Sequence, residues 1–276
     1  MINKKKIMLV FGTRPEAIKM APLILKLKSN AKNFDVKVCV TAQHRQMLDQ
    51  VLNLFGILPD IDFNVMETGQ DLFDVTINVL KGMKKTLENY NPDIVLVHGD
   101  TTTSLSTSIA CFYAGIKVGH VEAGLRTNNI YSPFPEEFNR QITSKITKWH
   151  FVPTETSRSN LIAENVQYDD ITITGNTVID SLYWILNRIK KNADVFTRVK
   201  NSLDQILPFD WESNKFILIT GHRRENFGKG FLNICEALKE LAMKFDQIKF
   251  VYPVHLNPNI QIPVYNLLAN IPNIYL

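Results

Sequence analysis

Carboxyl side chains follow apolar or turn-like stretches at three places in this sequence, and they are its first candidates for chemistry. Asp100 ends DIVLVHGD, Glu122 lies near the end of KVGHVEA, and Glu136 follows SPFP. Asp100 has a structural alternative as the N-cap of a following helix, and Glu136 as an acid in a first helical turn. Glu122 has no helix to cap, because Gly124 follows and the next helical pattern begins near Pro135. Carboxyl groups gathered at one site suit proton transfer, in which their surroundings tune them as acid and base.

Basic side chains near glycine-containing turns form a second set of candidates. The segment TGHRRENFGKG places His222, two arginines and a lysine between a strand-like run and a helical pattern, which suits an oxyanion such as phosphate. Arg14 and Lys19, in GTRPEAIKMAP, lie at the start of a predicted helix, where Arg14 opposes the helix dipole unless an anion is bound. The structural alternatives are a solvated charge pair for the arginines of TGHRRE and surface salt bridges for Arg14 and Lys19.

The elements that must position these groups alternate along the chain. Apolar, β-branched runs predict strands in KIMLVFGT, DVKVCVT, DIVLVHGD, KVGHVEA, WHFVPT and ITITGN, with helical patterns such as PEAIKMAPLILKLKSN between them. Strands this continuously apolar are buried on both faces, which predicts an α/β fold with a doubly wound parallel sheet. Polar motifs follow the strands one after another, and in such sheets ligands bind outside the carboxyl ends of the strands. One edge of the sheet is therefore the predicted working face.

A second α/β set follows the first, so we predict two domains of Rossmann-like type, residues 1–185 and 186–276. A helix from about Val178 to Lys190 closes the first domain, and the polar segment KKNADVFTRVKNSLDQ leads into a fresh strand in SNKFILITGH. Further strands are predicted in IKFVYPVH and NIYL. Because an open parallel sheet usually has more strands than these, we expect the second domain to be incomplete and the chain to be a fragment.

Composition excludes several classes of protein. The 276 residues are 45% hydrophobic, and the net charge of +4 comes from 31 basic and 27 acidic residues spread along the chain, which argues against a nucleic-acid partner. We expect no signal peptide, because the apolar run IMLVFG stops at Thr13 and Arg14 and no small-x-small cleavage site follows. We also expect no membrane-spanning helix, because no stretch approaches the roughly 18 apolar residues that one needs. Cys39, Cys111 and Cys235 each lie in an apolar segment without metal-ligand or CxxC spacing, as free thiols do in a reducing cytoplasm.

Nine of these motifs, in order, resemble one enzyme family. They are GTRPEAIKMAPL, VCVTAQHRQMLDQVL, VLVHGDTTTS, GHVEAGLRT, SPFPEEFNRQ, HFVPTETSRSNL, TGNTVIDSL, ITGHRRENFGKG and YPVHLNPN. Together they look like the non-hydrolysing bacterial UDP-N-acetylglucosamine 2-epimerases, which have the two-domain GT-B fold. The resemblance implies interconversion of UDP-N-acetylglucosamine and UDP-N-acetylmannosamine without a redox cofactor or a metal. It also implies anti elimination of UDP through a 2-acetamidoglucal intermediate, followed by re-addition of UDP.

The resemblance assigns roles to individual residues by motif. Asp100, Glu122 and Glu136 match the family's catalytic acids, and His222 matches its diphosphate-contacting histidine. Arg14 and Lys19 match contacts to the UDP-sugar, as do Asp100, Glu122 and His222. A second UDP-N-acetylglucosamine acts as an activator in many members, and the residues here that match its site are Gln43, His44, Gln46 and Gln70; solvated loop glutamines are the structural alternative.

The resemblance further implies a cytoplasmic homodimer that supplies N-acetylmannosamine for envelope polysaccharide. Members of the family are longer than this chain, and the part beyond its last residue carries a phosphate-binding serine-glycine-glycine loop. Two alternatives remain beside the resemblance. A GT-B glycosyltransferase would use the same class of UDP-sugar donor and transfer the sugar to an acceptor, and an inactive fragment would neither turn over the nucleotide sugar nor bind it.

Overall fold

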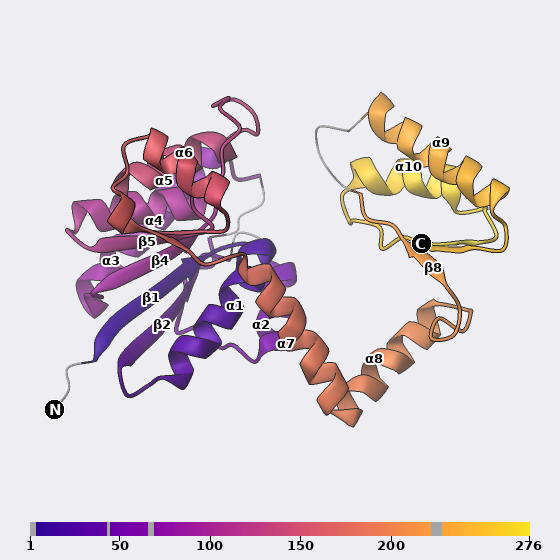
Figure 1. Ribbon diagram of the computed structural model, residues 1–276, viewed down its shortest axis with the longest axis horizontal. Coiled ribbons are helices and arrows are strands. Elements are labelled where there is room, and N and C mark those ends of the chain that lie inside the picture. The colour runs from indigo at the N-terminus through magenta and orange to yellow at the C-terminus, as the bar shows by residue number, and fades with distance from the viewer. Residues whose placement is uncertain (1–3, 43–44, 66–68, 222–227) are drawn as a thin grey trace. The chain divides into compact units, whose positions relative to one another are not determined.

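The chain forms two compact units in the computed structural model, Met1–Asn187 and Arg188–Leu276. The structure describes residues 4–42, 45–65, 69–221 and 228–276. The division lies two residues after the predicted boundary at residue 185. Figure 1 labels the elements of each unit, and each unit is described by itself below.

The first unit is built on a seven-stranded parallel sheet, which confirms the predicted α/β class. Its strand order is β3-β2-β1-β4-β5-β6-β7, and every neighbouring pair is parallel. The strands are β1 (Lys5–Phe11), β2 (Phe34–Val40), β3 (Ile61–Asp62), β4 (Ile94–His98), β5 (Lys117–Val121), β6 (Trp149–Val152) and β7 (Ile171–Ile173). The order reverses direction between β1 and β4, so the carboxyl ends of these strands flank the usual ligand-binding crevice of a doubly wound sheet.

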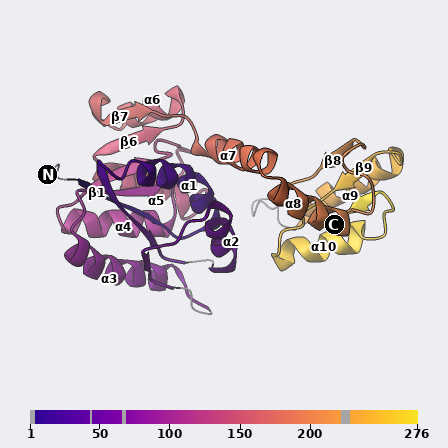
Figure 2. The same ribbon diagram turned by 90° about the horizontal axis from the view of Figure 1, so that it is seen from below.

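Helices cover both faces of this sheet, as the continuous hydrophobicity of the strands predicted. They are α1 (Arg14–Ser29), α2 (Arg45–Phe55), α3 (Leu72–Tyr90), α4 (Thr102–Tyr113), α5 (Glu136–Ile146), α6 (Glu155–Ala163) and α7 (Thr177–Lys191), with a 3-10 turn at Tyr168–Asp170. Figures 1 and 2 show α1 and α2 on one face and α3 and α4 on the other.

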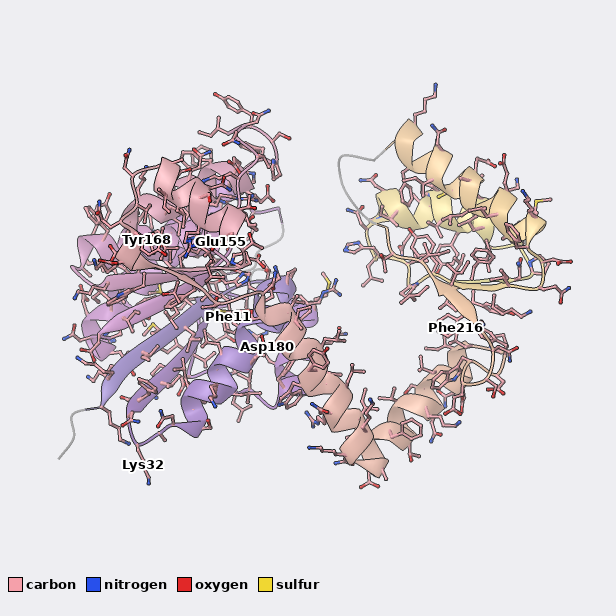
Figure 3. All side chains as sticks on the ribbon, viewed as in Figure 1. Phe11, Lys32, Glu155, Tyr168, Asp180 and Phe216 are labelled. Atoms are coloured by element: carbon pink, nitrogen blue, oxygen red, sulfur yellow. The ribbon has the colours of Figure 1, made fainter. Side chains whose placement is uncertain are left out.

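Alternate residues of β1 pack into the two hydrophobic layers on opposite faces of the sheet. Ile7, Leu9 and Phe11 pack with α1 and α2 on one face, and Phe11 is labelled in Figure 3. Met8 and Val10 pack with α3 and α4 on the other face. Both sets are nearly inaccessible to solvent. Because successive side chains of a strand point to opposite faces, a strand buried on both sides must be apolar at every position.

The second unit holds a three-stranded parallel sheet of order β10-β9-β8. Its elements are α8 (Ala193–Ile206), β8 (Phe216–Leu218), α9 (Lys229–Lys244), β9 (Lys249–Val251), α10 (Pro258–Leu268) and β10 (Ile274–Tyr275). The buried Asn273 amide donates to the carbonyls of Ala242, Phe245 and Ile248, tying the end of α9 to the start of β9 and β10. Phe216, labelled in Figure 3, is partly exposed on β8.

Helix α8 corrects one prediction from the sequence, which treated KKNADVFTRVKNSLDQ as a polar segment. Asn192 begins the helix, because its side-chain oxygen accepts hydrogen bonds from the amides of Asp194 and Val195. None of the helix residues is buried, but the segment also carries apolar residues at helical spacing, namely Phe196, Val199, Leu203 and Ile206. Within the described ranges, no helix of either unit is long and apolar enough to span a bilayer.

Candidate functional site

Glu122 follows β5 in a tight turn rather than at the start of a helix. Its backbone has φ of 61°, in the left-handed region that residues other than glycine rarely adopt. Gly124, at φ 82°, lies so close to α6 that a Cβ built on it would be 2.3 Å from the carbonyl oxygen of Ser157. Asn160 of α6 also donates to the Gly124 carbonyl at 2.9 Å. The turn is therefore fixed against α6 and holds the Glu122 carboxylate at the end of a rigid strand.

Three other elements converge on the Glu122 carboxylate. The Lys19 ammonium, from the second turn of α1, lies 2.6 Å from both carboxylate oxygens. The Asn176 amide, directly before α7, donates to Oε2 at 2.8 Å. His98, the last residue of β4, has its Nε2 atom 3.8 Å from Oε1. The Glu122 side chain is 11% exposed and the Lys19 side chain 23%, so the ion pair is largely shielded from water but still reachable from one side.

The buried His98 ring is neutral over the physiological pH range. Burial lowers its pKa to about 3, and the Lys19 charge acts in the same direction. Its Nε2 is buried without a hydrogen-bond partner in the described part of the chain. The neighbouring His120 is also buried, and burial lowers its pKa to about 3, while its Nε2 contacts the Gly99 carbonyl at 2.6 Å. His120 therefore braces the loop after β4, whereas His98 presents an unused nitrogen to Glu122.

Asp100 lies just beyond β4 and is paired with an arginine. Arg140 of α5 donates from Nη2 to its Oδ2 at 2.5 Å, and Asn139 donates to its backbone carbonyl at 2.8 Å. Burial raises the pKa of Asp100; Arg140 opposes this rise, and the nearby charges of Glu136 and Glu122 add to it. Helix α4 is capped by Thr101, whose hydroxyl accepts from the Ser104 amide, so the Asp100 carboxylate is not the cap that its position suggested.

The two acids that open α5 have different environments. Glu137 is fully buried and accepts hydrogen bonds from the amides of Thr127 and Asn128 and from the side chain of Gln141. Burial alone would raise the pKa of Glu137, but these donors and the Arg140 charge lower it overall. It therefore holds the loop after β5 in place. Glu136 is only partly buried, and its charge is close enough to raise the pKa of Asp100.

The loop after β1 borders the same region. Glu16 is buried and accepts from the amides of Gly12 and Thr13 and from the Thr101 hydroxyl. It thus joins the start of α1 to the start of α4, and burial raises its pKa. Arg14, the first residue of α1, is partly exposed, and its side chain makes no hydrogen bond or ion pair with the described residues.

The described structure places only some of the remaining predicted site residues. His222, Gln43 and His44 lie outside the described residues. Gln46 lies in the first turn of α2, and Gln70 directly precedes the N-cap of α3. Among the described residues, no group of three histidine, cysteine, aspartate or glutamate side chains is placed to hold a metal ion.

Sequence reasoning missed the partners of the two central acids. Arg140 stands in the quoted motif SPFPEEFNRQ and Asn176 in TGNTVIDSL, but neither was singled out. A signal existed for Asn176, since asparagine before a helical pattern indicates a cap. Nothing local in the sequence pairs Arg140 with a residue 40 positions earlier or Asn176 with one 54 positions earlier. These contacts come from the packing of α5 and α7 beside the strand ends.

The chain closely matches known proteins in sequence and structure. The family model described as UDP-N-acetylglucosamine 2-epimerase matches residues 26–276. The UDP-N-acetylglucosamine 2-epimerase from Campylobacter jejuni is 56% identical to it, over 99% of this chain and 70% of its own length. The UDP-N-acetylglucosamine 2-epimerase from Escherichia coli (strain K12) is 54% identical, over 98% of this chain and 71% of its own length. The crystal structure of UDP-GlcNAc 2-epimerase from Neisseria meningitidis bound to UDP-GlcNAc is 50% identical with a TM-score of 0.90, covering 98% of this chain and 71% of that one.

Proposed function

The chain belongs to the UDP-N-acetylglucosamine 2-epimerase family, and from this premise we propose that it inverts C2 of UDP-N-acetylglucosamine to give UDP-N-acetylmannosamine. A carboxylate removes the proton from C2 while the C1–O bond to UDP breaks, which leaves 2-acetamidoglucal and UDP. UDP then bonds to C1 again, and an acid delivers a proton to the opposite face of C2. The reaction consumes no net proton and needs no redox partner.

The observation that best supports this proposal is the pair of acids beyond neighbouring strands, each with its own cation. Glu122 after β5 is held by Lys19, and Asp100 after β4 is held by Arg140. A reaction that takes a proton from one face of a carbon and returns it to the other needs two such groups. Burial raises the pKa of Asp100, which suits a group that must both release and accept a proton near neutral pH.

The other assigned residues complete the proposed site. Glu136 is the third acid near C2, Arg14 contacts the UDP-sugar, and His222 contacts the diphosphate that departs and returns. The sequence resemblance supports these roles, since a leaving diphosphate is stabilised by arginine and histidine donors. In this proposal the first domain carries the acids and the second binds UDP.

Solvent isotope exchange tests the reaction directly. We expect the protein to produce the C2 epimer from UDP-N-acetylglucosamine in heavy water and to introduce deuterium at C2, as followed by NMR. Glu122→Gln and Asp100→Asn are each expected to slow this exchange by roughly 10²- to 10⁴-fold, the usual effect of a general acid or base. Glu155→Gln is the matched control, because that carboxylate lies on α6 with a side chain 66% exposed. No epimer and no deuterium at C2 would refute the proposal.

The two alternatives predict different results in related experiments. A GT-B glycosyltransferase would transfer the sugar to an acceptor, and alanine variants of Asp100, Glu122 and Glu136 would keep full activity. An inactive fragment would show neither a cooperative melting transition by circular dichroism nor a shift of that transition with UDP. We expect instead a cooperative transition that UDP moves to higher temperature, because a ligand that binds only the folded state stabilises it.

We also propose a homodimer in the cytoplasm that supplies N-acetylmannosamine for polysaccharide synthesis. A second UDP-N-acetylglucosamine acts as an activator through Gln43, His44, Gln46 and Gln70. These statements are supported by the motif resemblance alone. Light scattering on the purified protein measures its oligomeric state, and a sigmoidal dependence of rate on substrate that Gln46→Ala abolishes is the expected sign of the activator.

A further inference from the structure

The geometry points to Asn176 as a positioning residue that determines which oxygen of Glu122 works on the substrate. The inference rests on the proposed function of Glu122 as a proton-transferring group. Asn176 touches the carboxylate directly, with Nδ2 2.8 Å from Oε2. It lies in the connection between β7 and α7, whose residues the sequence motifs alone did not assign to the site.

Two contacts fix the orientation of the Asn176 amide. Its oxygen accepts from the Val178 amide at 3.1 Å, as a side chain at the start of a helix does. An amide group has its acceptor on one branch and its donors on the other. Because the amide oxygen is hydrogen-bonded to the start of α7, the NH₂ group faces Glu122 and donates to Oε2. The flipped amide orientation would break both hydrogen bonds.

This donation makes the two oxygens of Glu122 unequal. Lys19 contacts both oxygens at the same distance of 2.6 Å and does not distinguish them. Among the described residues, only Oε2 receives an amide donor in addition to Lys19, so a proton that Glu122 takes up belongs on Oε1. Oε1 faces the end of β4: His98 Nε2 is 3.8 Å away, and a Cβ built on Gly99 would be 4.0 Å away. The working oxygen thus points toward the loop that carries Asp100.

Asn176 is held where this contact requires it. The Ser181 hydroxyl of α7 donates to the Ile18 carbonyl of α1, one residue before Lys19. Trp184 and Ile185 of α7 pack on the core layer formed by β1, α1 and α2. Lys19 of α1 and Asn176, directly before α7, therefore approach Glu122 from two segments whose helices are hydrogen-bonded to each other. Glu122 itself has little freedom to adjust, since its backbone is already in the uncommon left-handed region.

The charged and titratable groups around the Glu122 carboxylate do not distinguish its two oxygens by a hydrogen bond, whereas Asn176 does. Lys19 comes from α1, His98 from β4 and Asp100 from the loop after β4. The Glu122 charge raises the pKa of Asp100. His98 is buried and too far from Oε1 for a hydrogen bond, and Asp100 bears a charge of the same sign as Glu122. Asn176 is the neutral donor that contacts a single oxygen.

Asn176→Asp separates positioning from helix capping. Aspartate starts a helix as well as asparagine does, so the bond to the Val178 amide is kept. The NH₂ donor is replaced by an oxygen that repels Oε2. We expect C2 deuterium exchange to fall by roughly 10- to 100-fold, the cost of losing a hydrogen bond to a charged group. Asn176→Ser, which also caps helices but is too short to reach Glu122, is expected to give a smaller loss in the same direction.

Infrared spectroscopy reports on the carboxylate whether or not the protein turns over substrate. The difference spectrum between the protein and Glu122→Gln isolates the Glu122 carboxylate bands, and the same difference is taken in the Asn176→Asp and Asn176→Ser backgrounds. We expect the asymmetric stretch to move to higher wavenumber in both, because Oε2 has lost a donor. Asn160→Asp is the matched control: it removes an amide donor to the same turn, at the Gly124 carbonyl, without touching the carboxylate. It is expected to lower stability and leave the Glu122 bands in place.

The outcomes separate this inference from the proposed function. Bands that stay fixed in both Asn176 variants overturn the positioning role even if the protein is an active epimerase. A protein that never exchanges C2 hydrogen refutes the proposed function, while the infrared bands still decide whether Asn176 sets the two oxygens apart. Equal band shifts in the Asn176 and Asn160 variants would assign the effect to general loosening of the turn and so contradict the inference.

Discussion

The turn that presents Glu122 predicts that Gly124→Ala is unusually costly. Gly124 has φ 82°, and a Cβ there would be 2.3 Å from the Ser157 carbonyl oxygen, a distance that real Cβ atoms do not reach. Gly115 supplies the matched control in the same unit: it has φ 69°, but nothing lies within 4 Å of the position that an alanine methyl group would take. Both substitutions place alanine in the left-handed region, so the difference between them isolates the steric contact with α6.

The magnitude follows from these two environments. The left-handed backbone costs alanine about 1–2 kcal/mol, part of which is offset because alanine also restricts the unfolded chain. We therefore expect Gly115→Ala to lower the free energy of unfolding by about 1 kcal/mol. Gly124→Ala must in addition push the buried Ser157 backbone away, and overpacking of this kind costs about 1–3 kcal/mol. The expected difference between the two variants is about 2 kcal/mol.

Urea unfolding followed by circular dichroism measures both variants. For a urea slope of about 1–3 kcal/mol/M, the expected difference separates the midpoints of Gly124→Ala and Gly115→Ala by roughly 1 M. Gly124→Ala is also expected to slow C2 exchange, because Glu122 is displaced with the turn, whereas Gly115→Ala is not. Equal destabilisation by the two substitutions, within about 0.5 kcal/mol, would refute the steric argument for this turn.

Two further predictions concern buried charges. Arg140→Leu leaves Asp100 and the fully buried Glu137 without their cation, and it should lower the free energy of unfolding in urea by about 3 kcal/mol. Arg158→Leu, at a pair whose carboxylate is 66% exposed, should lower it by less than about 1 kcal/mol, and equal effects would contradict the difference in burial. Burial lowers the pKa of His120 to about 3. Below pH 6.5 the unfolded chain therefore takes up a proton at this residue that the folded chain does not. The contribution of His120 to stability is thus fully present above pH 6.5 and declines as the pH falls toward 3. From pH 7 to pH 5, His120→Gln should lose about 2 kcal/mol less stability than the parent protein, and identical pH dependence in the two would refute the assignment.

Much of the fold could be predicted from the sequence because the central strands of the first unit are covered on both faces. Met8 and Val10 alternate with Ile7 and Leu9, so the part of β1 that follows its two lysines has no polar position, and such a run has few interpretations other than a buried parallel strand. Strand β3 and helix α8 were not predicted. Strand β3, at Ile61–Asp62, is too short to give a pattern, whereas α8 has apolar residues at helical spacing within a segment that was interpreted as polar.

The candidate site also has a part that the sequence predicts and a part that only the tertiary structure shows. The sequence by itself predicted that Asp100 and Glu122 lie at one edge of the sheet, since they follow buried strands, and parallel strands bring their carboxyl ends to one edge. It could also show that Glu122 has no helix to cap. What only the tertiary structure decided is the partner of each acid: Lys19 and Asn176 for Glu122, Arg140 for Asp100. These partners come from helices distant in sequence, and their side chains meet the acids only when α1, α5 and α7 pack beside the strand ends, because an ion pair between segments carries no local signal.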